Sequence, residues 1–239
     1  MAQRTALVTG AASGMGRAVA QALVARGVRV AALDRDEEGL AGDGSLPVVA
    51  DLVDVQAIPG VVAEIRRSLG PISILANVAG VSMLAPFDDD DYESIYATTM
   101  TINLESMVAL TRACLTDLIA DGAGRVINIA STEGLAPQRF LSPYAISKHG
   151  VIGLTRSLAV EVGRHGVTAN CICPGPILTG MTDVIPEEAR DRFASRHVPV
   201  GRYGRPEEVA HMVTALADPA ASFVNGAIIP VDGGMTAGT

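Results

Sequence analysis

Seven short runs of apolar, β-favouring residues recur along the chain, and segments of helical periodicity lie between most of them. The runs are continuously apolar rather than alternating, which is typical of parallel strands covered on both faces. They lie at residues 4–10, 27–34, 47–51, 72–80, 124–131, 166–175 and 226–234. The helical segments are 14–26, 55–69, 88–120, 143–165 and 206–217. We therefore predict an α/β fold, a doubly wound parallel sheet of about seven strands with right-handed crossovers and helices on both faces.

The length of the chain fits a single domain of this class. It has 239 residues, of which 49% are hydrophobic and 18% charged, so a large core can be buried. No repeat, linker or low-complexity tract interrupts the pattern. We expect residues 1–239 to form one domain.

Charge and hydropathy argue against several classes of partner. The formal net charge is −8, which disfavours binding to nucleic acid or to an anionic membrane surface. No apolar run approaches the roughly 18 residues that a membrane-spanning helix needs. The N-terminus also lacks the apolar stretch of a signal peptide. We expect a cytoplasmic protein that binds neither nucleic acid nor membrane.

Cysteine and histidine usage indicates no metal site. Cys171 and Cys173 alternate along one predicted strand, and Cys114 lies in a helical pattern. The histidines are scattered, at positions 149, 165, 197 and 211. Because a metal site needs several ligands at suitable spacing, we expect buried, reduced cysteines and no bound metal.

Two connections break the regular alternation. Residues 35–46 are too short and glycine-rich for more than one or two helical turns, and residues 176–205 form a long connection after the sixth strand. Long connections at the carboxyl ends of strands are where such sheets place ligands. We expect segments 81–87, 132–142 and 180–203 to shape a substrate pocket, with Glu133, Gln138 and Phe140 as candidates to face the substrate.

The first strand runs into the glycine-rich turn TGAASGMG, which contains Gly10, Gly14 and Gly16. Glycines keep a strand-to-helix turn tight and let a pyrophosphate approach the backbone, where the helix N-terminus offers free N–H groups. The spacing is a relative of G-x-G-x-x-G, and a plain turn would also explain it. The strand before it and the helical pattern after it favour a dinucleotide site.

Asp34 ends the second strand, about 20 residues beyond the glycine turn. A carboxylate at this place can accept hydrogen bonds from a ribose diol and would repel a 2′-phosphate. It could instead cap the short helix that follows, and the two roles are compatible. Asp34 therefore favours NAD over NADP.

Tyr144 and Lys148 stand four residues apart, just after the pair Ser142-Pro143. Serine can cap a helix and proline is tolerated in its first turn, so this pair predicts a helix start. Residues four apart share one face of a helix. A lone pair of this kind is most often an ordinary surface pair, so its interpretation depends on the rest of the chain.

In these motifs the chain resembles the short-chain dehydrogenase/reductase family over nearly its whole length. The motifs come in the family's order: TGAASGMG at 9–16, NVAG at 77–80, INIAS at 127–131, YAISK at 144–148 and CPGPILT at 173–179. Asn103 lies within TINLES, and Ser131 lies thirteen residues before Tyr144. Val78 departs from the second Asn that many members carry, without touching a catalytic role.

The resemblance implies a Rossmann-type fold and a role for each matching residue. Tyr144 would be the acid/base, Lys148 its electrostatic partner and ribose ligand, and Ser131 would orient the substrate oxygen. Asn103 would hold a water in a proton relay. The implied cofactor-binding positions are Gly10, Ser13, Gly14, Met15, Gly16, Asp34, Asp51, Leu52, Asn77, Ala79, Gly80, Tyr144, Lys148, Pro174, Gly175, Ile177 and Thr179.

Elementary electrostatics suggests why a lysine should accompany the tyrosine. A free phenol has a pKa of about 10, which is high for a base near neutrality. A positive charge about 5 Å away at an effective dielectric constant of about 20 contributes roughly 3 kcal/mol, or about two pKa units. We therefore expect Lys148 to lower the pKa of Tyr144.

The sequence thus predicts an NAD(H)-dependent oxidoreductase that interconverts a secondary alcohol and a ketone, with a small-molecule substrate. A 3-oxoacyl-(acyl carrier protein) reductase using NADPH is the alternative within the family, because such enzymes share these motifs. A non-catalytic dinucleotide sensor is the alternative from another class, and the complete catalytic set argues against it. The apolar helical patterns at 88–120 and 143–165, together with the resemblance, predict a homotetramer.

Overall fold

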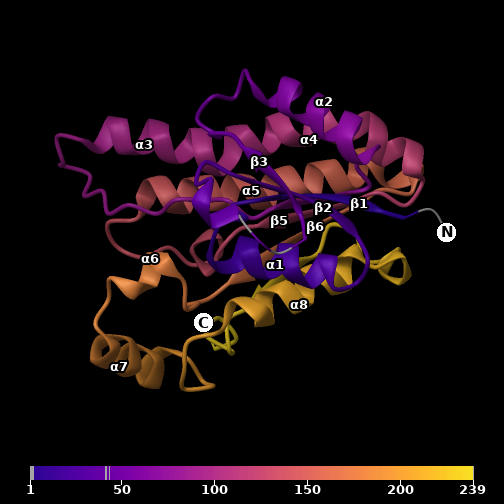
Figure 1. Ribbon diagram of the computed structural model, residues 1–239. Coiled ribbons are helices and arrows are strands. Elements are labelled where there is room, and N and C mark those ends of the chain that lie inside the picture. The colour runs from indigo at the N-terminus through magenta and orange to yellow at the C-terminus, as the bar shows by residue number, and fades with distance from the viewer. Residues whose placement is uncertain (1–2, 41, 43, 239) are drawn as a thin grey trace.

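The computed structural model describes residues 3–40, 42 and 44–238, and their central feature is one seven-stranded parallel sheet (Figure 1). The strands are β1 (Thr5–Thr9), β2 (Arg29–Asp34), β3 (Leu46–Val49), β4 (Ile74–Asn77), β5 (Arg125–Ile129), β6 (Thr168–Pro174) and β7 (Ile228–Val231). Their order is β3-β2-β1-β4-β5-β6-β7. The chain therefore changes winding direction between β1 and β4, and the carboxyl ends beside such a switch point are where ligands bind. The predicted fold class is confirmed.

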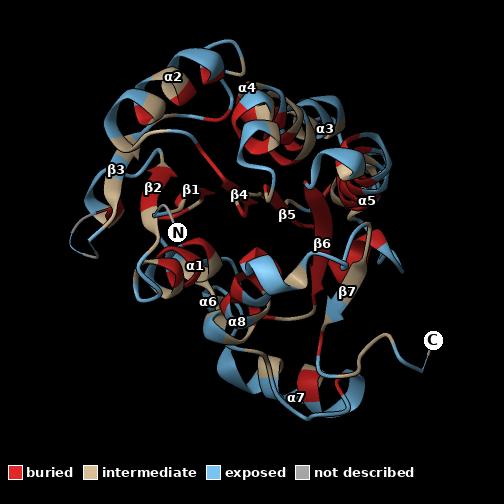
Figure 2. Cartoon of the chain, turned by 90° about the vertical axis from the view of Figure 1, so that its right-hand side faces the viewer, coloured by how far each residue is buried: buried red, intermediate tan, exposed pale blue. Residues whose placement is uncertain are grey.

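Helices cover both faces of the sheet (Figure 2). On one face α1 (Gly14–Val24) packs against α8 (Pro206–Ala217). The other face carries α2 (Ile58–Leu69), α3 (Tyr92–Met100), α4 (Ser106–Asp121) and α5 (Ser142–Val162). None of the helices among the described residues has both the length and the apolar character needed to cross a bilayer.

Burial of the strands follows their place in the sheet. Every residue of β1, β4, β5 and β6 is buried, whereas the edge strands β3 and β7 contain none that is fully buried. Two large apolar clusters fill the spaces between the sheet and its two helical layers. Continuous apolar runs in the central strands are what two covered faces require.

The structure refines three segments of the predicted pattern. The helical stretch expected at 88–120 is divided by a π turn, η2 (Thr101–Glu105). The long connection after β6 contains α6 (Gly180–Asp183) and α7 (Glu187–His197), which project beyond the carboxyl edge of the sheet (Figure 1). The short connection after β2 holds a single turn, η1 (Glu38–Leu40), as expected. The remaining short turns are η3 (Thr132–Gly134), η4 (Gly163–His165) and η5 (Pro219–Ala221).

Candidate active site

The turn between β1 and α1 is built so that glycine is needed at its bends. Gly10 has φ +69° and Gly14 has φ +49°, values that other residues rarely adopt. A Cβ at Gly16 would overlap the carbonyl oxygen of Gly10. Ser13 precedes α1 without forming a side-chain capping bond, so the N–H groups of the first helical turn are left for a ligand.

This turn forms one wall of a cavity of about 410 Å³ at the carboxyl edge of the sheet. The other walls come from the ends of β2, β3 and β4 and from the start of α6. Thr179, the N-cap residue of α6, lies against the glycine turn, because a Cβ at Gly14 would be 3.2 Å from its methyl group. At least five separate segments of the chain thus enclose one site.

The Asp34 carboxylate is held in place by two backbone groups. The N–H of Ala12, in the glycine turn, donates to Oδ2 at 3.1 Å, and the N–H of Asp36 donates to Oδ1 at 3.1 Å. The first bond joins the carboxylate to the dinucleotide turn, and the second caps the short connection after β2. The capping role considered for Asp34 is therefore present, and its role toward a ribose stays a prediction. Arg35 follows it in the lining of the cavity.

Asn103 lies in the π turn η2 and is fully buried. Its Oδ1 accepts a hydrogen bond from the N–H of Val81 at 2.8 Å, and its Nδ2 donates to the carbonyl of Val81 at 2.9 Å. Nδ2 also donates to Oγ of Ser147 at 3.1 Å. Because π turns displace side chains from the regular helical register, they often occur at functional sites. These bonds position Asn103 between the loop after β4 and helix α5.

Ser131, Tyr144 and Lys148 come together beside the cavity. Tyr144 is in the first turn of α5, and its phenol is hydrogen-bonded to the hydroxyl of Ser131, which follows β5. Lys148 lies one turn further along α5, with Nζ 5.4 Å from the centroid of the Tyr144 ring. Nζ is buried and donates to the carbonyl of Ile129 at 3.0 Å.

Burial dominates the electrostatics of this pair. Burial raises the pKa of Tyr144 to about 12, and the hydrogen bond with Ser131 opposes that rise only in part. Burial also lowers the pKa of Lys148 to about 8. The expectation that Lys148 lowers the pKa of Tyr144 is therefore wrong for the protein alone. The lysine ammonium donates to the Ile129 carbonyl, and desolvation of the phenol is the largest factor in the pKa of Tyr144.

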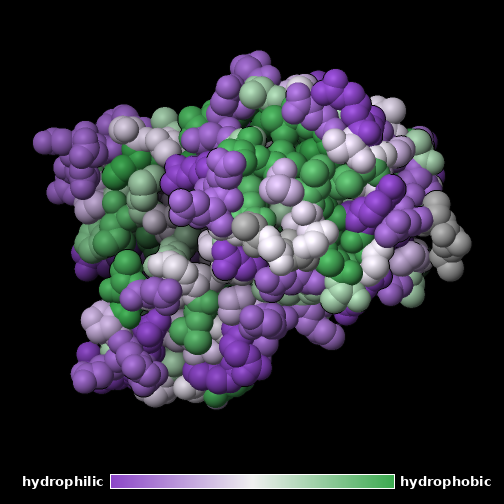
Figure 3. Space-filling view, in the orientation of Figure 1, coloured by the Kyte–Doolittle hydropathy of each residue, from purple (hydrophilic) through white to green (hydrophobic). Residues whose placement is uncertain are grey.

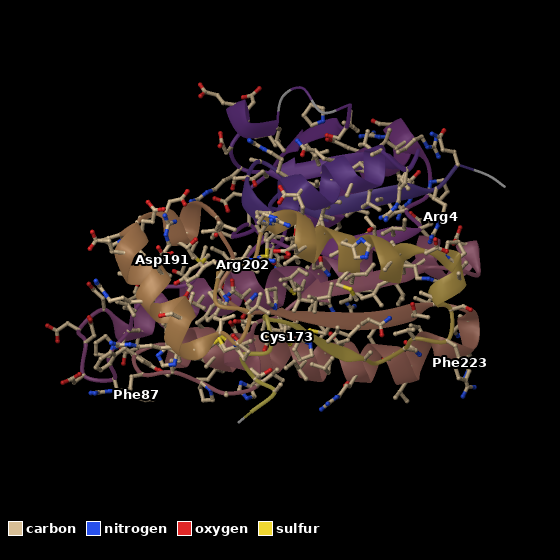
Figure 4. The ribbon with its side chains drawn as sticks, turned by 90° about the horizontal axis from the view of Figure 1, so that it is seen from below. Arg4, Phe87, Cys173, Asp191, Arg202 and Phe223 are labelled. Atoms are coloured by element: carbon tan, nitrogen blue, oxygen red, sulfur yellow. The ribbon has the colours of Figure 1, made fainter. Side chains whose placement is uncertain are left out.

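The three cysteines are free, buried thiols. Cys173 lies at the centre of the molecule (Figure 4), on β6. A hydrogen bond with Cys171 and another with the Ser131 backbone lower the pKa of Cys173, while burial opposes the shift. The charge of a Cys173 thiolate would be one of the smaller factors that raise the pKa of Tyr144.

Most of the predicted cofactor positions line the cavity. These are Gly10, Ser13, Gly14, Met15, Gly16, Asp34, Asp51, Leu52, Ala79, Gly80 and Thr179. Tyr144 and Lys148 lie outside this lining but next to it, since a Cβ at Gly80 would be 3.2 Å from Nζ of Lys148.

Four predicted cofactor positions lie away from the cavity lining. Asn77 is buried and donates from Nδ2 to Oδ1 of its strand neighbour Asn128 at 2.8 Å. Ile177 belongs to the apolar core, and Pro174 is buried at the end of β6. Gly175 packs so closely on Asp232 that a Cβ would be 2.8 Å from it. In the structure these four residues support the loop after β6 and the sheet beneath the cavity.

Several supporting residues were not predicted from the sequence. Oγ1 of Thr9 accepts hydrogen bonds from the N–H groups of Val78 and Ala79, at 3.0 and 3.1 Å, and so fixes the wall beside Gly80. Ser147 donates to the carbonyl of Tyr144 at 2.7 Å while accepting from Asn103. Thr9 lies within the motif TGAASGMG and Ser147 within YAISK. Their place in these motifs is the only sequence feature that could have indicated their supporting roles.

The start of α5 also differs from the prediction. Ser142 is the first residue of the helix rather than its cap, and the N-cap residue Leu141 offers no side-chain acceptor. The hydroxyl of Ser142 is instead paired with that of Tyr92, at 2.9 Å. Pro143 occupies the first turn as expected. The helix end that carries Tyr144 is thereby tied to α3.

Comparison with known proteins agrees with this geometry. The family model described as enoyl-(acyl carrier protein) reductase matches residues 10–236. A 3-oxoacyl-(acyl carrier protein) reductase (FabG) of Vibrio harveyi is 37% identical over 97% of this chain and 97% of that protein. The chain belongs to the short-chain dehydrogenase/reductase family.

Other members of the family act on sugars and polyketides. A galactitol 2-dehydrogenase (L-tagatose-forming) of Cereibacter sphaeroides is 38% identical over 97% of this chain and 94% of its own length. A gluconate 5-dehydrogenase of Burkholderia cenocepacia, solved with NADP and tartrate, has a TM-score of 0.90 at 30% identity, covering 98% of this chain and 95% of that one. A variant actinorhodin polyketide ketoreductase with NADPH has a TM-score of 0.90 at 35% identity, covering 98% and 97%.

This short-chain dehydrogenase/reductase is therefore an oxidoreductase that acts on CH–OH or keto groups with a nicotinamide dinucleotide. The cavity fits such a cofactor. It offers a glycine turn at a helix N-terminus for a pyrophosphate and a fixed carboxylate, Asp34, for a ribose diol.

Proposed function

We propose that this protein is an NAD(H)-preferring dehydrogenase/reductase that interconverts a secondary alcohol and a ketone, with Tyr144 as the acid/base. The observation that carries the proposal is the hydrogen-bonded pair Ser131–Tyr144 beside the cavity, with Lys148 one turn along the same helix. Each has a chemical task in this reaction.

The chain's own residues handle the proton, while the bound nicotinamide dinucleotide gives or takes the hydride. During reduction the phenol of Tyr144 donates its proton to the ketone oxygen, and the Ser131 hydroxyl holds that oxygen in place. A phenol with a pKa of about 12 stays protonated at neutral pH, which suits it to this acid role. During alcohol oxidation the same groups accept the proton, and the Lys148 ammonium stabilises the phenolate.

Asp34 supports a preference for NAD. Its carboxylate is held by Ala12 and Asp36 at the cavity wall, where it can accept hydrogen bonds from ribose hydroxyls and would repel a 2′-phosphate. Arg35 is the residue that could pair with a phosphate instead. Because Asp34 is fixed by two backbone bonds and Arg35 is exposed, the carboxylate should dominate.

Reduction of a 3-oxoacyl thioester with NADPH is the second candidate function, favoured by the 37% identity to the Vibrio harveyi reductase. The catalytic geometry serves both reactions. The test is a comparison of kcat/KM for a panel of secondary alcohols and their ketones, and for a 3-oxobutanoyl thioester, each with NAD(H) and NADP(H). Turnover of none of them with either cofactor would refute the proposed function.

We further propose a cytoplasmic homotetramer with two-fold axes. Free buried thiols suit a reducing compartment. Apolar side chains remain exposed on α5 and its surroundings, including Val160, which is 85% exposed, and Phe223, which is fully exposed. Phe223 and Phe87 point outward at opposite ends of the molecule (Figure 4). Closed assembly would bury such faces symmetrically, and light scattering that reports a 24.6 kDa particle at micromolar concentration would contradict it.

A further inference from the structure

Glu133 is a buried acidic residue beside the catalytic serine. It is 5% exposed, in the short turn η3, and its N–H donates to Oγ of Ser131 at 3.1 Å. Among the residues that the structure describes, it forms no ion pair with a lysine or arginine. A carboxylate removed from water without a cation is costly unless hydrogen-bond donors satisfy it.

The protein satisfies only one side of this carboxylate. The N–H of Gln138 donates to Oε2 at 2.8 Å, which ties the loop after η3 to Glu133. Within the described part of the chain, Oε1 takes part in no hydrogen bond. Oε1 is left as an unused acceptor, and it is not among the described polar atoms that are both fully buried and unpartnered, so a ligand in the solvent can reach it.

Glu133 lies close to the reacting groups. The turn η3 is pressed against the part of α5 that carries Tyr144 and Lys148, since a Cβ at Gly134 would be 3.0 Å from the Lys148 carbonyl oxygen. The charge of Glu133 is near enough to the phenol to help raise the pKa of Tyr144. Its backbone, through Ser131, and its side chain, through its charge, thus both reach the catalytic pair.

The loop after η3, which follows Glu133, lies at the same side of the molecule as the loop after β4, where we expect the substrate to bind. The carbonyl of Phe140 accepts a hydrogen bond from the N–H of Ala85 at 2.7 Å, and Phe140 adopts the left-handed backbone conformation with φ +64°. This bond joins the loop after η3 to the loop after β4. Figure 3 shows hydrophobic side chains around the hollow on this side, between α3 and α6. An acceptor on this side of the molecule, with largely apolar surroundings, would select for one polar group.

We infer that Oε1 of Glu133 is a substrate-binding group that accepts a hydrogen bond from a second hydroxyl next to the reacting carbon. The inference rests on the proposed function and names its substrate class: vicinal diols and polyols, and the α-hydroxyketones formed from them. A carboxylate accepts but cannot donate, so it favours a hydroxyl and repels a carboxylate or phosphate at the same place. An alcohol without the second hydroxyl leaves Oε1 desolvated and unpaired, and such sites discriminate strongly.

Matched alcohols test this inference. We would measure kcat/KM for 2,3-butanediol against 2-butanol, and for trans-cyclohexane-1,2-diol against cyclohexanol, with NAD and with NADP. The wild type should prefer the diol of each pair by at least about 100-fold. Equal rates, or a preference for the mono-alcohol, would overturn the inference while leaving the proposed function standing. Oxidation of none of the four would overturn the inference, and the wider panel described above would then decide the proposed function.

Two variants assign the preference to Glu133. Glu133→Gln keeps an oxygen for the Gln138 N–H but loses the charge, so the diol preference should fall at least about tenfold, since charge-assisted bonds are about twice as strong. Glu133→Met should remove the preference almost completely. Activity on all four alcohols should change less than about threefold in the control Glu161→Gln, which alters an exposed glutamate on α5. An unchanged diol preference in Glu133→Gln would show that the residue only closes the loop, and the wild-type ratio decides the substrate class even if Glu133→Met does not fold.

Discussion

Asn103 and Val81 exchange two hydrogen bonds, one in each direction, at 2.8 and 2.9 Å. One residue lies in the π turn between α3 and α4, and the other follows β4 at the cavity wall. The two bonds resemble those between neighbouring strands of a sheet, except that the side-chain amide of Asn103 takes the place of one backbone. The two hydrogen bonds use both polar atoms of the Asn103 amide. The main structural role of Asn103 is therefore to hold the cavity wall at Val81 in place. The expected water relay through Asn103 stays a prediction.

Exchange of Asn103 for aspartate tests this fastening. Asn103→Asp replaces the Nδ2 donor with an acceptor that faces the Val81 carbonyl and the Ser147 hydroxyl. We expect the free energy of unfolding to fall by about 1–3 kcal/mol and kcat/KM to fall at least about tenfold. Ser147→Ala removes only one of the three bonds and should cost about 0.5–1.5 kcal/mol. Chemical denaturation and steady-state kinetics measure both, and equal effects of the two changes would contradict this assignment.

Gly80 is where a single methyl group should interfere with catalysis. A Cβ at this position would lie 3.2 Å from Nζ of Lys148 and 3.3 Å from Oδ1 of Asn103, which is tighter than ordinary contact. Gly80→Ala should displace one of them and lower kcat/KM at least about tenfold, because small misplacements of catalytic groups can cost about 100-fold. The control is Gly60→Ala on α2, where a methyl group meets nothing within 4 Å. That change should leave activity intact and raise stability by about 0.5–1 kcal/mol.

Catalysis should depend on the phenol of Tyr144 and not on its packing. Tyr144→Phe keeps the ring and removes the proton, so we expect kcat to fall at least about 100-fold, the usual scale of general acid/base help. Cofactor affinity and the melting temperature should change little. Tyr96→Phe on α3, a residue that is 37% exposed, is the matched control and should leave activity unchanged. If Tyr144→Phe retained more than about a tenth of the activity, another group would have to be the acid.

The pH profile of ketone reduction should report Lys148 rather than Tyr144. The pKa of Tyr144 is raised to about 12, so the phenol keeps its proton throughout the working range. The pKa of Lys148 is lowered to about 8, so its ammonium is charged below that pH and neutral above it. We expect kcat/KM for reduction to be flat at lower pH and to fall through about pH 8 with the loss of one proton.

Arginine keeps its charge at any pH reached in such an assay, which supplies the control for this profile. Lys148→Arg should lower activity because the buried site is shaped for an ammonium, but its remaining activity should show no fall near pH 8. A wild-type profile that stayed flat beyond pH 8 would contradict the lowered pKa of Lys148.

The sequence predicted the sheet, and it predicted that Tyr144 and Lys148 lie together on one helix, because both features leave strong local signals. Continuous apolar runs mark the buried strands, and a tyrosine and a lysine four apart lie on one helical face whatever surrounds them. The electrostatics could not be predicted in the same way. The pKa of Tyr144 depends on how completely the phenol is desolvated and on Lys148 donating to the Ile129 carbonyl, and a backbone acceptor has no signature in the sequence.

The surroundings of residues predicted by motif alone could not be predicted from the sequence. Asn77 belongs to the same short motif as Gly80, yet its amide is bonded to Asn128 on the neighbouring strand, and the register of β4 and β5 decides this. The role of Thr9 likewise depends on which loop the fold brings to its hydroxyl. Such contacts join residues 51 to 70 positions apart and are properties of the packed sheet.

Replacement of Asp34 should change the choice of cofactor. The wild type should prefer NAD over NADP at least about tenfold in kcat/KM, equivalent to about 1.4 kcal/mol. Asp34→Ala removes the acceptor for the ribose hydroxyls and the like charge that opposes a 2′-phosphate. It should therefore lower kcat/KM with NAD, raise kcat/KM with NADP and so narrow the ratio between them. It also removes the acceptor for the Ala12 N–H, which lies in the glycine turn, so some affinity for both cofactors should be lost.

Asp34→Asn separates these two effects. The amide oxygen can still accept a hydrogen bond from the Ala12 N–H and hold the turn, while the negative charge is gone. We therefore expect kcat/KM with NADP to rise without a general loss of cofactor affinity. Arg35→Ala is the complementary change, since it removes the neighbouring cation from the cavity wall. If the carboxylate governs the site, Arg35→Ala should reduce the residual use of NADP and leave NAD almost unchanged. If instead the wild type used NADP as well as NAD, and Arg35→Ala abolished that use, Arg35 rather than Asp34 would set the preference.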